Sequence, residues 1–176
     1  MSSSYQRALA PPAGDCVVVG RELANTALAY SRTSPRKRVI LPFHKHGGES
    51  LHRMFNAVQP GSYLRPHRHV EPPKAEVFLV LQGALAMFVF EDDGRVRECF
   101  RLEAGGERFG IDLSPGLYHS FLALEPDTLL YEVKNGPYEP ATAKDFAPWA
   151  PDEEMPEAEG YARELRAVFD AWAMKC

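Results

Sequence analysis

The most constraining feature of this sequence is a regular alternation of short apolar runs and turn-forming residues between positions 39 and 134. For example, the runs 76–81 and 84–90 flank Gln82-Gly83, which is the pattern of a tight β-hairpin. About eight or nine short strands at regular spacing predict an all-β sandwich or barrel. The expected strands cover residues 39–43, 52–59, 76–81, 84–90, 95–102, 109–113, 118–124 and 128–134.

Two glycine-framed segments of this region carry candidate functional residues. The first, residues 61–83, contains His67 and His69, and Glu76 opens the apolar run that follows them. Alternate residues of a strand point to the same side, so the two histidines are expected to share one face. The second segment, residues 110–119, ends in a third histidine. A jelly-roll barrel brings strands that are distant in sequence side by side, and it would let this third histidine reach the first two.

The imidazoles of His67, His69 and His119 and the carboxylate of Glu76 suit one borderline divalent metal ion, such as Fe, Zn, Ni or Mn. Four protein ligands leave two positions of a six-coordinate ion for water or substrate, which supports isomerisation, hydrolysis or O2 chemistry. The sequence does not choose among these reactions and assigns no catalytic residue. Two alternatives stay open. The His-x-His pair could be simply polar, and Glu76 could instead hold an imidazole in one tautomer.

These segments resemble the two motifs of the cupin superfamily. The first reads Gly61-x5-His67-x-His69-x6-Glu76-x6-Gly83, and the second reads Gly110-x4-Pro115-Gly116-x2-His119. The resemblance implies a double-stranded β-helix, or jelly-roll barrel, with the three histidines and the glutamate at the metal-ligand positions. The gap between His69 and Glu76 is longer than in the usual motif. Cupins often dimerise through barrel edges, so the resemblance also implies a possible homodimer.

A further resemblance covers most of the chain, from about residue 15 to about residue 155. Residues 53–57, 63–69, 132–138 and 146–151 are similar to the WbuC family of cupin fold metalloproteins. Members of that family occur with bacterial surface-polysaccharide genes. The resemblance therefore implies a metal-binding cupin, with a small polar or anionic and possibly sugar-derived molecule as its ligand. Both a metal-dependent enzyme and a non-catalytic ligand-binding module agree with it.

Candidates for binding that small molecule follow from strand parity. Tyr63 and Arg65 share the face of His67, so Tyr63 could donate a hydrogen bond and Arg65 could clamp a carboxylate or phosphate. Packing at the barrel mouth is the alternative for both. Glu132 and Lys134 share a face of the last strand, where they would form an ion pair or contribute to the pocket. Two further histidines, at positions 44 and 46, are expected on a loop surface, with capping of the pocket mouth as the alternative.

Composition limits the remaining possibilities. A chain of 176 residues accommodates one domain with a real core. The net charge of −4 gives no sign of a nucleic-acid partner. Three widely spaced cysteines do not predict disulfides, so a reducing cytoplasm is the default location. No apolar run approaches the roughly 20 residues that span a bilayer, so no membrane partner is expected.

The predicted organisation is a single cupin domain over residues 15–157, preceded by a disordered segment and followed by a helix. Tyr161, Leu165 and Phe169 belong to an apolar stripe at helical spacing, which predicts that the last helix is amphipathic and packs on the domain. The expected parts are a disordered stretch 1–14, a short strand 15–19, a helix 20–31, the barrel 38–134, a wrapping segment 135–157 and the helix 158–174.

Overall fold

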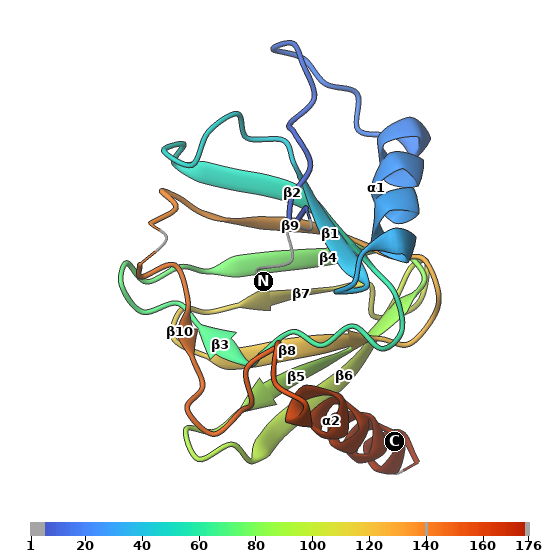
Figure 1. Ribbon diagram of the computed structural model, residues 1–176, viewed down its shortest axis with the longest axis vertical. Helices are drawn as coiled ribbons and strands as arrows, with labels where there is room; N and C mark the ends of the chain where they lie inside the picture. The colour runs from blue at the N-terminus through green and yellow to red at the C-terminus, as the bar shows by residue number, and fades with distance from the viewer. Residues whose placement is uncertain (1–5, 140, 175–176) are drawn as a thin grey trace.

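The computed structural model describes residues 6–139 and 141–174. Two five-stranded antiparallel sheets face each other, as Figure 1 shows, with strand orders β1-β2-β9-β4-β7 and β10-β3-β8-β5-β6. The strands are β1 Arg38–Pro42, β2 Leu51–Val58, β3 His67–Arg68, β4 Glu76–Gln82, β5 Ala84–Phe90, β6 Val96–Glu103, β7 Gly110–Leu113, β8 Tyr118–Ala123, β9 Thr128–Asn135 and β10 Asp145–Phe146. The predicted all-β, jelly-roll fold is confirmed.

The space between the sheets is filled by alternate residues from both. Phe78 of β4 and Leu130 of β9 come from one sheet, and Met87 of β5 and Phe121 of β8 come from the other; all four are buried in one apolar cluster. Such burial is the main favourable contribution to folding. The strand order also places β3 beside β8 and β4 beside β9, so that segments distant in sequence become neighbours.

The hairpin between β4 and β5 turns at Gly83, as predicted. This residue has φ +71°, and a Cβ added to it would lie 2.6 Å from Thr128 Oγ1. The Thr128 hydroxyl lies 2.8 Å from the carbonyl oxygen of Glu125 and 3.1 Å from that of Ala84, and the backbone Cα of Thr128 would lie 3.0 Å from the added Cβ, so rotation of the side chain cannot make room. Both the backbone conformation and the close approach therefore require glycine here.

The N-terminal region differs from expectation in two places. Residues 15–19 form no strand, and the side chain of Val18 is 84% exposed, so an apolar run alone did not define a strand there. Instead, Ala8 forms a parallel bridge with Ile40 of β1, and Leu9 is buried. The predicted disorder over 1–14 therefore does not hold for residues 8 and 9, and residues 1–5 lie outside the described part of the chain.

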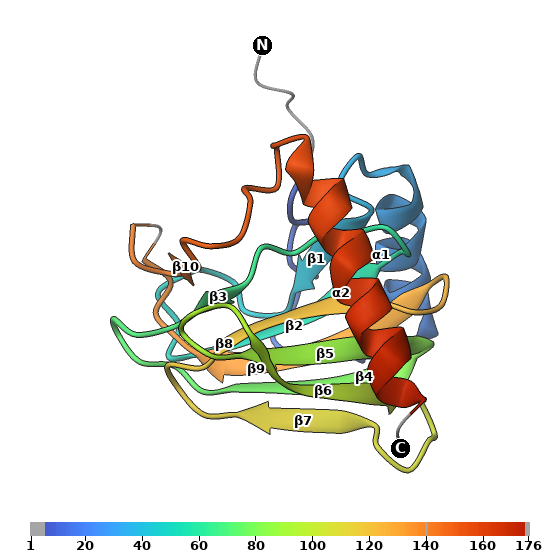
Figure 2. The same ribbon diagram turned by 90° about the horizontal axis from the view of Figure 1, so that it is seen from below.

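Helices cover the outer faces of both sheets. The helix expected over 20–31 is α1, Arg21–Thr33, and it buries Ala27 and Leu28 in the same apolar cluster as residues of β1 and β2. The C-terminal helix is α2, Glu157–Ala173, which lies across the β5–β6 sheet in Figure 2. Its Leu165 and Phe169 pack in a cluster with residues of β5 and β8. No helix in the described ranges combines the length and the apolar character that a membrane span needs.

The segment after β9 crosses the outside of the barrel. Trp149 packs on Phe90 and Tyr118, with ring centroids 5.1 and 5.8 Å away, whereas Phe146 is 43% exposed. Trp149 therefore holds the segment to the barrel by packing. Phe146 lies in β10, where backbone pairing with β3 positions it.

Glu153 ties this segment to the barrel through two arginines. Its carboxylate lies 2.5 Å from Arg38 Nη2 and 2.8 Å from Arg36 Nη2. Burial alone would raise the pKa of Glu153, but the two guanidinium groups outweigh it and lower the pKa to about 2. A lowered pKa in the folded state contributes stability above the unfolded pKa, which is lost as pH falls through the folded value.

Glu153→Gln is therefore expected to reduce the free energy of unfolding at pH 7 by roughly 1–3 kcal/mol, because two guanidinium groups lose their shared carboxylate. The difference from wild type should shrink between pH 4.5 and about 2, as the wild-type carboxyl becomes protonated. Urea unfolding across this pH range measures both effects. Glu154→Gln is the matched control, because its partner Arg7 and Glu154 are both exposed. A loss of stability that does not depend on pH would contradict the ion pairs of Glu153 as its cause.

Candidate metal centre

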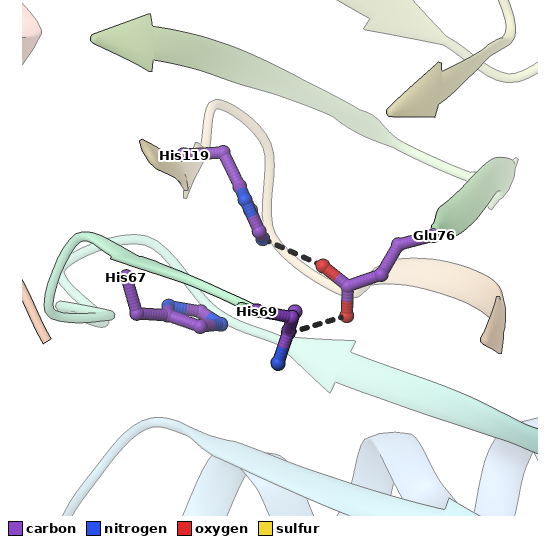
Figure 3. Close-up of side chains that lie close together, drawn as sticks. All are labelled: His67, His69, Glu76 and His119. Carbon is purple, nitrogen blue, oxygen red and sulfur yellow. Dashed lines mark ion pairs between the residues drawn. The ribbon is translucent and has the colours of Figure 1, made fainter. Parts of the chain in front are cut away.

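Four predicted side chains meet between the two sheets. His67 of β3 is the register partner of His119 of β8, and their ring centroids lie 4.7 Å apart. His69 follows β3 directly, and Glu76 is the first residue of β4 in the opposite sheet. Each is at most 3% exposed. One ligand atom from each residue falls within 4.8 Å of all the others, in the arrangement of Figure 3.

Backbone carbonyls fix the tautomers of all three imidazoles. The Nδ1 atoms of His67, His69 and His119 lie 3.0, 2.5 and 2.9 Å from the carbonyl oxygens of residues 65, 143 and 117. A carbonyl can only accept, so each Nδ1 carries the proton and donates it. Each Nε2 is then left with a lone pair, which is the form of histidine that binds a metal.

The inner atoms of the cluster are acceptors without donors. Burial, with a further contribution from Lys144, holds the pKa of His67 well below its usual value, so this ring is neutral. His69 Nε2 lies 3.1 Å from one oxygen of Glu76, and His119 Nε2 lies 2.8 Å from the other. The Nε2 atoms of His69 and His119 and Glu76 Oε2 have no hydrogen-bond partner, although all are buried. Because buried acceptors need a donor or a cation, these residues fit a divalent metal ion.

Glu76 stays ionised because of its neighbour on β9. Burial by itself would raise the pKa of Glu76, but the charge of the neighbouring Lys134 ammonium outweighs burial and holds that pKa well below its usual range. Lys134 Nζ lies 3.1 Å from Glu76 and 2.6 Å from Glu132, and Asn56 donates to Glu132 at 2.6 Å. The two carboxylates overcome the effect of burial on Lys134 and raise its pKa. The Glu76 carboxylate is thus part of a buried charged network.

The long gap before Glu76 does not move this residue away from the histidines. Val70 and Pro73 form an antiparallel bridge, which closes the additional residues into a turn. Glu76 then enters β4 in register with Lys134 on one side and Leu113 on the other. It contacts the imidazoles of His69 and His119 directly, so it remains a candidate both for binding a metal and for orienting an imidazole.

A cavity of about 850 Å³ opens onto the cluster. His67, Glu76 and His119 line it, together with the apolar rings of Phe78 and Phe121. A volume of this size suits a small molecule. Many charged side chains also line the cavity, so it suits a polar ligand. The arrangement therefore places a candidate metal centre at a cavity large enough for a ligand.

The predicted ligand-binding residues have different positions. Arg65, Glu132 and Lys134 line the cavity, and the ion pair expected between the last two is present. Arg65 donates to the Ala147 carbonyl at 2.9 Å and lies 3.3 Å from an Asp152 carboxylate oxygen, so its guanidinium is already engaged.

Tyr63 is placed differently from the prediction, outside the lining of the cavity. Its hydroxyl donates to the carbonyl of Pro151 at 2.9 Å, and its ring packs edge-on against Tyr161. Tyr63 therefore belongs to the contact between the barrel and the wrapping segment. The assumption of an extended strand failed here because β3 contains only His67–Arg68.

Other residues line the cavity as well. His44 takes the alternative position considered for it, at the cavity, and stacks on His52 with ring centroids 4.1 Å apart, whereas His46 is exposed as expected. Asn56 and Lys144 also line it. The polar character of Asn56 within an apolar strand was a usable signal. Lys144 comes from an irregular segment and had none.

Comparisons with known proteins find similarity over parts of the chain. Residues 19–102 match a family model described as a domain of unknown function, DUF6016. No curated protein matches the chain. Among solved structures, KdgF from Halomonas sp. is similar at 23% identity and TM-score 0.44, over 59% of this chain and 80% of that chain.

Oxalate decarboxylases are also similar to this chain. The E162A mutant of the Bacillus subtilis enzyme matches at 21% identity and TM-score 0.45, over 56% of this chain. The Lactobacillus farciminis enzyme, in a formate complex, matches at 19% identity and TM-score 0.44, over 57% of this chain. The matched region spans 24% and 28% of these two enzymes, respectively.

Proposed function

We propose that this protein is a metal-dependent enzyme of the cupin type that acts on a small anionic molecule. The observation that carries the proposal is the set of buried acceptors at the centre. Three imidazoles have their Nδ1 protons committed to carbonyls, and the Nε2 atoms of His69 and His119 face the Glu76 carboxylate with no donor between them. A divalent cation satisfies this arrangement, and the adjoining cavity leaves room for a ligand.

The metal ion and the protein side chains would contribute different parts of the chemistry at this centre. A bound divalent ion lowers the pKa of water and polarises an oxygen of the substrate. His67, His69, Glu76 and His119 would hold the ion, while the backbone carbonyls keep the rings oriented. Lys134 keeps Glu76 ionised, and the rings of Phe78 and Phe121 line the cavity beside the site. These features suit hydrolysis, isomerisation or oxygen chemistry.

We further propose that the substrate is derived from a sugar and is connected with surface polysaccharides. This proposal is supported by the resemblance of residues 53–57, 63–69, 132–138 and 146–151 to the WbuC family. The cavity of about 850 Å³ is large enough for a sugar acid.

The second candidate function is a non-catalytic module that binds a metal and a ligand. It is favoured by one observation: the charged side chains predicted to act on a substrate already have ion-pair partners within the protein. Glu132 pairs with Lys134, and Arg65 pairs with Asp152, so neither pair offers a plainly available acid or base.

Turnover distinguishes the two candidates. Metal-loaded protein would be incubated with nucleotide sugars, sugar acids and keto acids, and consumption would be followed by chromatography. For an enzyme we expect consumption that a chelator stops and the same metal restores. Tight binding of one compound without metal-dependent consumption would select the binding module.

Metal removal also has an expected effect on stability. A ligand that binds only the folded state at about 1,000 times its Kd stabilises that state by about 4 kcal/mol. Removing the metal by dialysis against a chelator should therefore lower the melting temperature, and adding one equivalent of metal should restore it. Elemental analysis of aerobic and anaerobic preparations identifies the ion. A melting temperature that does not change on adding any divalent metal would contradict the proposed centre.

A further inference from the structure

The cations that line the cavity are not all equivalent. Each arginine that lines it lies beside a carboxylate, and so does Lys134, which contacts Glu132 and Glu76. The arginine pairs are Arg7–Glu154 at 3.5 Å, Arg36–Glu153 at 2.8 Å, Arg38–Glu153 at 2.5 Å and Arg65–Asp152 at 3.3 Å. Each of these cations therefore already has a carboxylate partner within the protein, and Glu153 is shared by two of them.

Lys144 is the exception among the lining cations. It directly precedes β10, whose residues Asp145 and Phe146 pair with β3, and its neighbour Ala143 accepts the Nδ1 proton of His69. The backbone of Lys144 is thus fixed next to the segment that carries His67 and His69. Within the described residues, no hydrogen bond or ion pair connects its ammonium to a carboxylate.

The electrostatic surroundings agree with an uncompensated charge. Burial, with a contribution from the charge of Lys134, lowers the pKa of Lys144 to about 8, against opposing contributions from Glu76 and Glu132. The positive charge of Lys144 is also one reason why the pKa of His67 is low. The ammonium therefore lies within electrostatic reach of the histidine cluster.

We propose that Lys144 binds a carboxylate of the substrate, whose remaining polar groups face the four-residue centre in the same cavity. This inference rests on the proposed function and specifies its substrate class as a small carboxylic acid. A divalent ion at the centre would be half neutralised by Glu76, and Glu132 is matched by Lys134. The cavity would then carry excess positive charge on both the ion and Lys144, which an anionic ligand relieves.

A carboxylate suits this position better than a phosphate. Phosphate sites usually combine several donors, such as bidentate arginines or the N-terminus of a helix, with lysine as an added point charge. The arginines of this cavity are occupied by Asp152, Glu153 and Glu154. A single ammonium matches the single charge of one carboxylate, so Lys144 acts here as a compact point charge.

The test measures binding to zinc-loaded protein by calorimetry. The probes are the sugar acids and keto acids, and their methyl esters and inorganic phosphate serve as comparison compounds. Lys144→Met removes the charge with little change of volume, Lys144→Arg retains it, and Lys45→Met is the control for an exposed lysine outside the cavity. We expect Lys144→Met to weaken the best acid about tenfold or more, and to leave the zinc content and the weaker affinity for its ester unchanged. Lys144→Arg should retain most of the affinity.

The possible failures are distinguishable. Equal affinity of wild type and Lys144→Met for the acid overturns the role of Lys144 and leaves the metal centre intact. Zinc-loaded wild type that binds none of the acids, or that prefers phosphate, overturns the substrate class. A chain that binds no zinc, with no other divalent metal in elemental analysis, overturns both the proposed function and the inference built on it.

Discussion

His119→Ala is expected to lower the affinity for a divalent metal by more than about 100-fold, and to leave purified protein nearly free of metal. Loss of a partner that merely orients a metal ligand typically costs about 10–100-fold in affinity, and loss of the ligand itself should exceed that. Elemental analysis and competition with a chromogenic chelator measure the effect. His119 is the informative choice because its β8 strand is far in sequence from the other histidines.

His46→Ala is the matched control for this variant. His46 is exposed on a loop and lies outside the four-residue cluster, so its removal should leave metal content unchanged. Because His119 is buried, its variant must also be shown to fold, by circular dichroism and by a cooperative urea transition. A folded His119→Ala protein that holds as much metal as wild type would refute the convergence of ligands that the geometry indicates.

The convergence of the four side chains could be predicted from one local rule together with a resemblance. Extended backbone places both rings of a His-x-His pair on one face, and the resemblance of the two glycine-framed segments to cupin motifs indicated the remaining members of the set. What local rules do not supply is the carbonyl partner of each ring. The carbonyl that accepts from His69 belongs to Ala143, which is distant in sequence and is positioned by the pairing of β10 with β3.

The predictions that failed and the one that was missing have the same origin. Tyr63 was placed by strand parity, but residues 62–66 form no strand, so period-two reasoning did not apply to it. Val18 belonged to an apolar run, yet no element of the fold covers it and it remains exposed. Lys144 lies in a segment without periodicity, so only the folded arrangement shows that it reaches the cavity. In each case the deciding contact came from tertiary structure.

Lys134→Met is expected to lower the free energy of unfolding of the metal-free protein by about 3–5 kcal/mol, which is the usual cost of removing one partner from a buried ion pair. The ammonium lies between Glu76 and Glu132, 3.1 and 2.6 Å from their oxygens, and its side chain is only 14% exposed. Its removal leaves two buried carboxylates that repel each other. Urea unfolding at pH 7 gives the size of the loss.

Two further measurements separate charge from packing in this variant. Adding Glu132→Gln should recover part of the lost stability, because one of the two unpaired charges disappears. Lowering the pH should also narrow the difference from wild type. The wild-type pKa of Glu76 is held low, so the ion pair contributes above the unfolded pKa and is lost on acidification, while the variant gains from protonating its unpaired carboxylates. A loss that neither the second substitution nor acid reduces would instead reflect packing of the lysine stem. Adding zinc to the Lys134→Met protein should restore part of its lost stability. A bound cation can replace the ammonium as the partner of the Glu76 carboxylate, but not as the partner of Glu132. The recovered part therefore measures the contribution of Glu76.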